Sequence, residues 1–390
     1  MFYENRGDLK TIGLFNDSFP PIMDGVSLTT QNYAYWLQKK NQSVCVVTTK
    51  TPNYFDSEPY PIYRYSSIPV LGRKPYRFGL PEIDLLFQNK IDKISFGLVH
   101  AHCPFSSGRI ALNIAKKQKI PFVATFHSKY RDDFEHSVYN KYIVKQMTNE
   151  IIRFFEKADE VWISQPRVEE TIREYGFKGK IEVVPLGNDF SCDQPIEPIK
   201  KQARKDLQIS GHDTVFLFVG QLIWEKNIRR IVESLILIKD LTFKMFFVGN
   251  GYASEDLKQL IINSGLNNKV EIVGVITDRD KLKQYFAAAD LFLFPSTYDT
   301  WALVVREAAA LCTPSVLVEE STVAEIITNN QNGFLVANTT ESFATKLREL
   351  IFNPELIKRV GLNASKEITR SWESVTEEVL DRYQHLMNRK

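Results

Sequence analysis

The sequence predicts an α/β protein made of two doubly wound parallel-sheet domains. At 390 residues the chain is too long for one ordinary hydrophobic core, so two domains of about 190 residues each are expected. Short apolar segments alternate with helical stretches through the whole chain, which is typical of parallel strands covered by helices on both faces. This alternation pauses once, over residues 188–213, and then begins again in the same form.

The first half starts with a predicted strand at residues 11–15, followed by a loop and a helix at residues 27–40. Asn41 follows that helix, where a residue that tolerates a left-handed backbone is useful. Further short apolar runs predict strands at residues 44–47, 98–101, 122–125, 161–164 and 181–184.

The second half starts with a predicted strand at residues 215–219. Its other strands are expected at residues 244–248, 270–273, 291–294 and 315–318. Between the halves, residues 188–213 are mixed and polar and contain Pro195 and Pro198, as expected of a linker. Residues 371–387 form a predicted final helix, with apolar positions at helical spacing at Trp372, Val375, Val379 and Tyr383.

Composition favours a soluble globular protein. Hydrophobic residues make up 44% and charged residues 25% of the chain, and a net charge of +2 does not suggest a nucleic-acid binder. The N-terminus lacks the apolar core of a signal peptide, and no run approaches the roughly 20 apolar residues of a membrane span. The four cysteines contain no C-x-x-C pair, so the simplest interpretation is reduced thiols in a cytoplasmic protein.

Asp299 and Glu307 are the most informative pair of residues. Asp299 lies in the loop after an apolar strand, and Glu307 lies inside the helix that follows, with Thr300 as a candidate N-cap. A helix N-terminus favours a bound phosphate, whereas two carboxylates suit the hydroxyl groups of sugars. A nucleotide-sugar contains both kinds of group. Taken alone, the two acids also fit a solvated loop aspartate and a helix-surface glutamate.

Further motifs in the chain resemble those of the retaining GT-B glycosyltransferases of family 4, group 1, and occur in the same order. That family carries a Glu-x7-Glu motif, in which Asp299 stands at the first position and Glu307 at the second. The other matching segments are Asp24-Gly25-Val26, His127 in ATFHS, VVPLGNDF (183–190), VGQLIWEKN (219–227), FFVGNGYASEDLKQL, YFAAADLFLFPS, EESTVAEII and NGFLV (332–336). The resemblance extends from about residue 11 to about residue 385.

The resemblance implies a GT-B fold, in which two Rossmann-like domains face each other across a cleft. Residues 1–192, together with a crossover helix at 371–390, would bind the acceptor. Residues 193–370 would bind the nucleotide-sugar. No separate cofactor is implied.

The resemblance also assigns roles to individual residues of the donor site. Lys226 would neutralise phosphate charge, and Glu307 would accept hydrogen bonds from the ribose hydroxyls. The backbone N–H groups of Leu303 and Val304 would face the diphosphate. Asp299 would reach the hexose, although its side chain is one methylene shorter than the usual Glu.

Three further positions complete the expected donor site. His127 would lie beside the hexose and act in catalysis with Lys226 and Asp299. Gly25 and Gln221 would line the donor as well. Gln221 replaces the usual Arg of the family and Ala302 its usual Gly, so the donor sugar stays open and catalysis has room to be weaker.

Neither histidine pairs nor acid pairs predict a metal site. His100 and His102 form an HxH pattern that we interpret as structural or as part of the acceptor side. Asp278-Arg279-Asp280 has the spacing of a DxD metal motif, but it precedes a predicted helix, where acids are ordinary first-turn residues. The family resemblance implies that no divalent ion is needed, because a helix dipole and Lys226 would take its place.

The acceptor side is basic. Residues 59–81 resemble the corresponding loop of bacterial diacylglycerol glucosyltransferases. The segment from Arg64 to Lys117 contains nine Lys and Arg residues but only three acidic residues. An anionic membrane surface or a lipid acceptor would fit this charge, whereas a plain solvated basic face would explain it equally well. The candidate contacts are Arg64, Arg73, Lys74, Tyr76 and Arg77.

Three functions are therefore compatible with the sequence. The first is retaining transfer of a hexose from a nucleotide-sugar, with UDP as the expected carrier, to a hydroxyl group of a membrane lipid. The second is the same reaction on a polysaccharide, a protein or a soluble acceptor. The third is a non-catalytic partner subunit that only binds a nucleotide-sugar.

Overall fold

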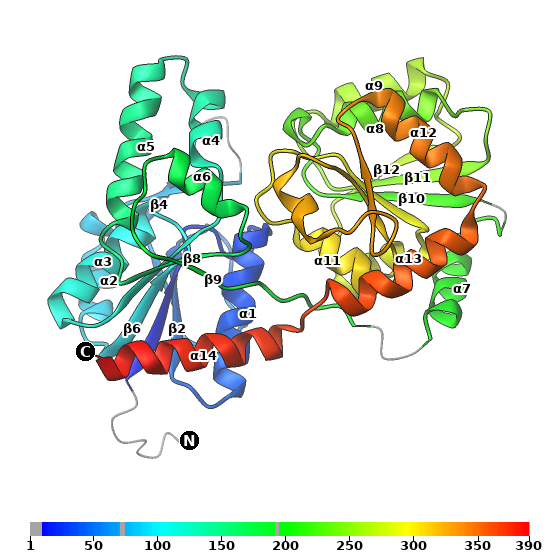
Figure 1. Ribbon diagram of the computed structural model, residues 1–390. Coiled ribbons are helices and arrows are strands. Elements are labelled where there is room, and N and C mark those ends of the chain that lie inside the picture. The colour runs from blue at the N-terminus through cyan, green and yellow to red at the C-terminus, as the bar shows by residue number, and fades with distance from the viewer. Residues whose placement is uncertain (1–9, 71–74, 192–194, 212, 390) are drawn as a thin grey trace. The chain divides into compact units, whose positions relative to one another are not determined.

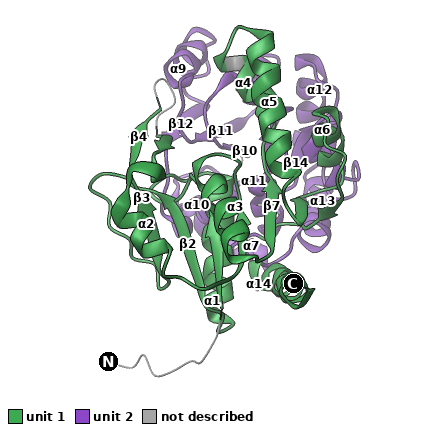
Figure 2. Ribbon diagram, turned by 90° about the vertical axis from the view of Figure 1, so that its left-hand side faces the viewer, with its two compact units in different colours: residues 1–187, 372–390 green, residues 188–371 purple. Residues whose placement is uncertain are grey.

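The computed structural model describes residues 10–70, 75–191, 195–211 and 213–389. The chain divides into two compact units, which are coloured separately in Figure 2. Unit 1 contains residues 1–187 and 372–390, and unit 2 contains residues 188–371. The C-terminal helix therefore belongs to the unit that the N-terminus begins.

Unit 1 is built on a parallel sheet of strand order β3-β2-β1-β6-β7-β8-β9 (Figure 1). The strands are β1 (Thr11–Phe15), β2 (Val44–Thr49), β3 (Ile62–Tyr65), β6 (Phe96–Ala101), β7 (Phe122–Phe126), β8 (Glu160–Ile163) and β9 (Ile181–Val183). The helices are α1 (Gly25–Lys39), α2 (Leu85–Ile91), α3 (Ser106–Gln118), α4 (Tyr130–Ser137), α5 (Lys141–Phe155), α6 (Val168–Glu174) and α14 (Trp372–Arg389). Every residue of β2 and β6 is buried, as expected of a parallel sheet covered on both faces.

A small antiparallel ribbon lies outside this sheet. It consists of β4 (Ser67–Pro69) and β5 (Arg77–Gly79), and the short 3₁₀ helix η1 (Pro81–Ile83) follows it. Ile68 and Phe78 are partners across the ribbon, and about half of each side chain is exposed.

Unit 2 is built on a second parallel sheet, of order β12-β11-β10-β13-β14-β15. The strands are β10 (Thr214–Val219), β11 (Phe243–Val248), β12 (Val270–Gly274), β13 (Leu291–Phe294), β14 (Ser315–Val318) and β15 (Phe334–Val336). The helices are α7 (Ile196–Asp206), α8 (Ile228–Ile236), α9 (Ser254–Asn263), α10 (Arg279–Ala288), α11 (Leu303–Ala310), α12 (Thr340–Ile351) and α13 (Pro354–Glu367), with the 3₁₀ helices η2 (Trp224–Lys226) and η3 (Thr322–Ile326).

Both sheets have the doubly wound order, in which the strand order reverses beside the first strand. In unit 1 the reversal lies between β1 and β6, and in unit 2 it lies between β10 and β13. Loops that leave the carboxyl ends of these two strands run to opposite sides and leave a crevice where ligands bind. The two switch points are therefore where functional side chains are expected to gather.

The predicted α/β class with two doubly wound parallel sheets is confirmed, and each predicted strand is present. Asn41 follows α1 with a left-handed φ of 60°, as expected. The interpretation of residues 188–213 as a plain linker is wrong, because α7 occupies much of it. Strands β3 and β15 were not predicted, because each is a short edge strand inside a segment assigned to a motif or an acceptor loop.

Candidate functional site

Lys226 and Asp299 form an ion pair in unit 2. The Nζ of Lys226 lies 2.6 and 2.8 Å from the two carboxylate oxygens of Asp299. The hydroxyl of Ser296 donates a further hydrogen bond to Asp299, at 2.5 Å. Because Lys226 follows β10 and Asp299 follows β13, the pair spans the switch point of the sheet. The sequence predicted both residues for one site, and the structure brings them into direct contact.

Glu307 lies buried in α11, where its side chain is only 2% exposed and accepts a hydrogen bond from Arg279. The guanidinium of Arg279 also lies 3.2 Å from the carboxylate of Asp189. Burial raises the pKa of Glu307, and the positive charge of Arg279 partly offsets this effect. Ribose hydroxyls would have to join or displace Arg279 to reach Glu307, so that contact stays a prediction.

The sequence interpretation gave no role to Arg279. Asp278 is the N-cap of α10 and accepts hydrogen bonds from the backbone amides of Asp280 and Lys281, so its interpretation as a helix-start acid is confirmed. Arg279 itself sits in the first turn, at the positive end of the helix dipole, where a cation is unfavourable without a partner. A cation in the first turn of a helix was therefore the one feature of the sequence that indicated an acidic tertiary partner for Arg279, such as Glu307.

The N-terminus of α11 carries no side-chain cap. Ala302 is the N-cap residue, so the expectation that Thr300 caps this helix is wrong, because the helix begins two residues later than that role requires. Leu303 and Val304 occupy the first turn, as the predicted diphosphate contact needs. The contact itself is not tested by the structure.

The loops after β10 and β11 approach each other closely at two glycines. Gly220 and Gly249 have φ values of 152° and 142°, and a Cβ atom on Gly249 would lie 1.9 Å from the carbonyl oxygen of Gly220. Only glycine fits such an approach without strain. Gln221 follows Gly220 directly and is exposed at this edge of the sheet. Its contact with a donor stays a prediction.

In unit 1, His127 is the last of three neighbouring histidine rings, His100, His102 and His127, at the ends of β6 and β7. Its Nε2 lies 3.1 Å from Nδ1 of His102, and the two rings are stacked with an interplanar angle of 24°. His100, one step further in, is hydrogen-bonded to the hydroxyls of Tyr383 in α14 at 2.5 Å and of Thr125 at 2.7 Å. His100 is thus structural, as one of the two open interpretations held.

Burial controls the charge of this row. It lowers the pKa of His100 and His102 well below 6.5, and that of His127 to about 3. All three rings are therefore neutral near pH 7. A neutral His127 can donate and accept one hydrogen bond each, which suits a sugar hydroxyl, but its contact with a hexose stays a prediction.

The switch point of unit 1 is occupied by Asp17. Its carboxylate accepts hydrogen bonds from the hydroxyl of Tyr65 at 2.5 Å, the thiol of Cys103 at 2.8 Å and the backbone amide of Ser107 at 3.1 Å, and from Ser106 Oγ. Sequence analysis missed this cluster, because its members lie on separate loops and helices. Burial, followed by the charge of Asp17, raises the pKa of Cys103, so that thiol stays protonated.

Gly25 is the first residue of α1, which follows the loop that carries Asp17. Asp24 caps the helix by accepting a hydrogen bond from the amide of Ser27 at 2.8 Å. A Cβ atom on Gly25 would meet nothing within 4 Å, so the glycine borders open space. A ligand could approach the backbone there, and the donor role of Gly25 stays a prediction.

The basic segment is less available than the sequence suggested. The side chain of Arg64 is 10% exposed, and its guanidinium bonds to Asp56 and to the carbonyl oxygens of Thr49 and Pro20. The expectation that Arg64 faces a membrane or an acceptor is therefore wrong, because its charge is already neutralised inside unit 1.

Of the other four candidate contacts in this segment, the structure describes two. Arg77 is half-buried and donates hydrogen bonds to the hydroxyl and the carbonyl oxygen of Ser67, and Tyr76 is half-buried. Arg73 and Lys74 lie outside the described residues. Among the helices that are described, none is both long and apolar enough to span a bilayer.

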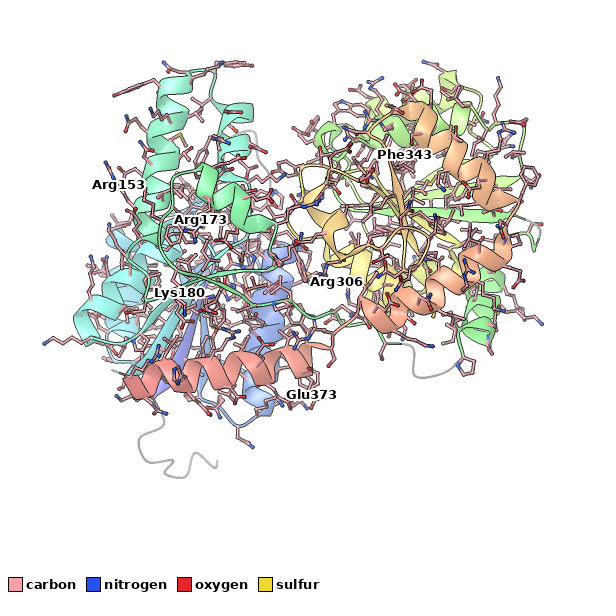
Figure 3. The ribbon with its side chains drawn as sticks, in the orientation of Figure 1. Arg153, Arg173, Lys180, Arg306, Phe343 and Glu373 are labelled. Atoms are coloured by element: carbon pink, nitrogen blue, oxygen red, sulfur yellow. The ribbon has the colours of Figure 1, made fainter. Side chains whose placement is uncertain are left out.

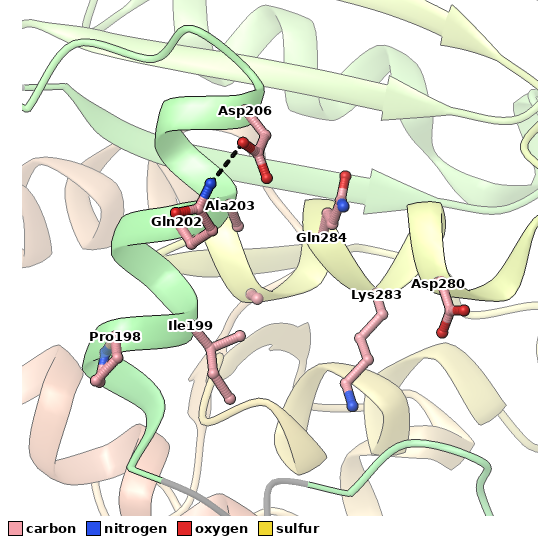
Figure 4. Close-up of a pocket in the computed structure, with 9 residues that line it drawn as sticks. Pro198, Ile199, Gln202, Ala203, Asp206, Asp280, Lys283 and Gln284 are labelled. Carbon is pink, nitrogen blue, oxygen red and sulfur yellow. Dashed lines mark hydrogen bonds between the residues drawn. The ribbon is translucent and has the colours of Figure 1, made fainter.

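Two other features bear on function. Within the described ranges, no group of three or more His, Cys, Asp or Glu side chains is arranged to hold a metal ion. A cavity of about 380 Å³ lies between α7 and α10 (Figure 4), lined by Ile199, Gln202, Lys283 and their neighbours. It contains none of the predicted site residues, so it is separate from the switch point of unit 2.

Comparisons with known proteins identify the family of the chain. Residues 23–191 match the family described as Glycosyltransferase Family 4, and residues 199–367 match the family described as Glycosyl transferases group 1. An alpha-monoglucosyldiacylglycerol synthase from Streptococcus pneumoniae is 25% identical over 355 residues, which cover 88% of this chain and 79% of that protein. The synthase of the same name from Acholeplasma laidlawii is 25% identical over 406 residues, covering 97% and 100%.

Solved structures share the fold at low identity. Sucrose-phosphate synthase from Thermosynechococcus elongatus superposes with a TM-score of 0.81 and 19% identity, covering 98% of this chain and 100% of that one. HepE from Anabaena, in complex with UDP-glucose, superposes with a TM-score of 0.76 and 16% identity over 97% and 100%. The chain therefore belongs to the family 4, group 1 glycosyltransferases and has their GT-B fold.

Proposed function

We propose that this glycosyltransferase moves a hexose from a UDP-sugar to a hydroxyl group of a glycerolipid, with retention of anomeric configuration and without a metal ion. The observation that carries the proposal is the Lys226–Asp299 pair at the switch point of unit 2, beside the uncapped N-terminus of α11. A phosphate-binding helix end, a cation and a sugar-binding carboxylate are the parts that a nucleotide-sugar requires.

The donor would be held by three kinds of contact. The backbone amides of Leu303 and Val304 would bind the diphosphate, and Glu307 would bind the ribose. Lys226 would leave Asp299 in part to neutralise the charge that grows on the departing diphosphate, and Asp299 would turn to the hexose hydroxyls. The choice of UDP is supported by the UDP-glucose bound to HepE, which shares the fold.

Retention would follow from attack on the same face of the sugar from which the diphosphate leaves. The bond between the anomeric carbon and the phosphate oxygen breaks, and a bond to the acceptor oxygen forms. The leaving phosphate oxygen takes the proton of the acceptor hydroxyl, so no protein nucleophile is needed. The protein supplies charge stabilisation and orientation, which account for most of the rate gain in such sites.

A lipid acceptor is favoured by the names of two relatives and by the surface of unit 1. Both relatives are alpha-monoglucosyldiacylglycerol synthases. On unit 1, Ile68 and Phe78 are about half exposed on the β4–β5 ribbon, and two tyrosines are largely exposed, Tyr139 between α4 and α5 and Tyr142 at the start of α5. Exposed aromatic and aliphatic side chains near basic residues suit the interface of an anionic bilayer.

The decisive experiment is product detection. Purified protein is incubated with UDP-hexoses and with diacylglycerol or glucosyl-diacylglycerol in anionic vesicles, and lipid products are identified by mass spectrometry and anomeric NMR. We expect an α-linked glycolipid whose yield is unchanged in EDTA and is strongly reduced in Lys226→Met. Transfer only to soluble acceptors would contradict the lipid assignment.

Membrane attachment is tested separately by co-sedimentation. Wild-type protein should bind anionic vesicles at low salt, and a variant with Ser at Phe78, Tyr139 and Tyr142 should bind several-fold less. Donor hydrolysis without acceptor should persist in that variant. If the wild-type protein binds nucleotide but hydrolyses no donor, the result would instead favour the hypothesis of a non-catalytic partner subunit.

A further inference from the structure

Arg306 is a buried cation that has no anionic partner among the residues that the structure describes. It lies in α11, one residue before Glu307, and only 5% of it is exposed (labelled in Figure 3). Within the described part of the chain, no hydrogen bond or ion pair is formed by its guanidinium, and its Nη1 is buried without a partner. A buried donor without a partner is costly, and a buried charge more so, so such a group calls for an explanation.

The guanidinium of Arg306 lies over the ring of Trp301. Its central carbon is 3.2 Å from the ring centroid. Trp301 lies two residues before α11 begins, so the cation reaches back to the N-terminal end of the helix, as long helical side chains do. The Nε1 of Trp301 is also buried without a partner. Two unpartnered hydrogen-bond donors therefore lie together at the uncapped helix start.

The electrostatics of this position demand an anion. Burial lowers the pKa of Arg306 to about 9, so the side chain is still protonated near pH 7. The N-terminal end of a helix carries a partial positive charge of its own, which adds to the unfavourable energy of the cation. The interaction with the Trp301 ring offsets only part of this cost.

Two other cations of the site, Lys226 and Arg279, are neutralised by acidic side chains of the protein. Lys226 is paired with Asp299, and Arg279 is paired with Glu307 and Asp189. These pairs leave no net positive charge for a diphosphate. Arg306 is different, because it carries a full charge that no acidic side chain among the described residues balances.

We propose that Arg306, with the indole N–H of Trp301, binds a phosphate group of the nucleotide-sugar at the N-terminus of α11. This inference rests on the proposed function for the identity of the ligand. The guanidinium is held in place before the ligand binds, and the phosphate supplies the negative charge that the surrounding protein lacks. A guanidinium can bind two phosphate oxygens at once, which fixes orientation as well as charge.

The test uses the opposite effects that Arg306→Met should have on stability and on binding. Met fills a similar volume without charge, so removing an unpaired buried cation should raise the melting temperature of the free protein by roughly 2–4 °C. The same change should weaken UDP about 10- to 100-fold, while uridine binds as in the wild type. If Arg306 had a merely structural role, Arg306→Met would lower the stability of the protein and leave its UDP affinity unchanged.

Arg229 provides a matched control. Its guanidinium lies 4.5 Å from the ring centroid of Trp224 in the same unit, but Arg229 is exposed. Arg229→Met removes the same chemical group from a tryptophan ring and should change neither melting temperature nor UDP affinity. Arg306→Lys should keep part of the affinity, because the charge remains and the two-pronged geometry is lost.

Inorganic pyrophosphate separates this inference from the choice of nucleotide. Pyrophosphate should raise the melting temperature of the wild type and have much less effect on Arg306→Met. If pyrophosphate stabilises only the wild type while UDP does not bind, the choice of UDP is wrong and the anion site stands. If pyrophosphate stabilises neither protein, or both equally, the role of Arg306 is overturned.

Discussion

The two units use the same topological position in opposite ways. In unit 2, the loops at the switch point are joined by a lysine–aspartate ion pair, and the adjacent helix α11 starts without a side-chain cap. In unit 1, the corresponding loops are joined by Asp17, whose carboxylate accepts hydrogen bonds from a hydroxyl in β3, a thiol in the loop before α3 and an amide at the start of α3. One unit leaves its anion position open, and the other fills it.

The difference shows where a phosphate can bind. In unit 1, the carboxylate of Asp17 lies at the start of α3, where it repels a second anion and takes the helix amide of Ser107. In unit 2, the corresponding helix start has an unpartnered cation, Arg306, beside it. Charge alone therefore favours unit 2 for the diphosphate and leaves unit 1 to neutral groups such as hydroxyls. Four experiments test this contrast.

Lys226→Met should have the largest effect. Removing a charge that stabilises the departing diphosphate should lower kcat about 10²- to 10³-fold, by analogy with other single donors in reacting sites. Binding of the free nucleoside should change little, because the nucleoside has no phosphate. Steady-state kinetics and nucleoside calorimetry measure the two quantities. Equal losses in both would mean that Lys226 acts on ground-state binding.

Glu307→Ala should weaken UDP binding by roughly 2–4 kcal/mol, because two ribose hydrogen bonds to a charged group are lost. The same substitution should lower the unfolding free energy by a few kcal/mol, because it removes the buried acidic partner of Arg279. Glu307→Gln is the matched control, since it keeps the shape and one acceptor oxygen. Normal UDP affinity in the alanine variant, measured by titration calorimetry, would remove Glu307 from the donor site.

Asp17→Asn should lower stability without lowering nucleotide affinity. Its donors would lose a charged acceptor, at a cost of about 1–3 kcal/mol. Because unit 1 is not expected to bind the diphosphate, UDP affinity should match the wild type. Urea unfolding and UDP titration report the two effects. A tighter hold on UDP or pyrophosphate in this variant would mean that unit 1 competes for phosphate after all.

Acid should destabilise unit 1 through its histidines. In the unfolded chain each histidine binds a proton near pH 6.5, whereas burial keeps the folded pKa values well below that, near 3 for His127. The unfolded state therefore binds more protons as pH falls below about 6.5, and each histidine lowers the unfolding free energy by up to roughly 1.4 kcal/mol per pH unit.

Hydrogen exchange between pH 6.5 and 4.5 can resolve the two units. Amides of unit 1, such as those of β6 and β7, should lose protection faster with falling pH than amides of β10 and β13. His127→Asn is the control and should reduce the pH dependence in unit 1 by about one proton. Equal pH dependence in both units would show that the buried row does not govern acid stability.

The sequence alone was sufficient for the α/β class and for most strands. Buried parallel strands are local runs of apolar residues, and the helices between them repeat with their own period, so both can be recognised without tertiary information. The same holds for Asp299 and Glu307, whose spacing around a helix start is a local property. The short edge strands β3 and β15 escaped prediction because they carry too few residues for a clear period.

Only the tertiary structure decided which charges are available. Lys226 meets Asp299 across 73 positions of sequence, and Asp17 meets Cys103 across 86, because the strand order of each sheet brings those loops together. Arg64 looked like a surface cation, but its side chain is only 10% exposed and is hydrogen-bonded to acceptors within unit 1. Arg306 looked like an ordinary helix residue, and it is buried with no acid beside it in the described part of the chain. A sequence shows where a charge is carried, but its energy depends on burial and on partners that distant strands supply.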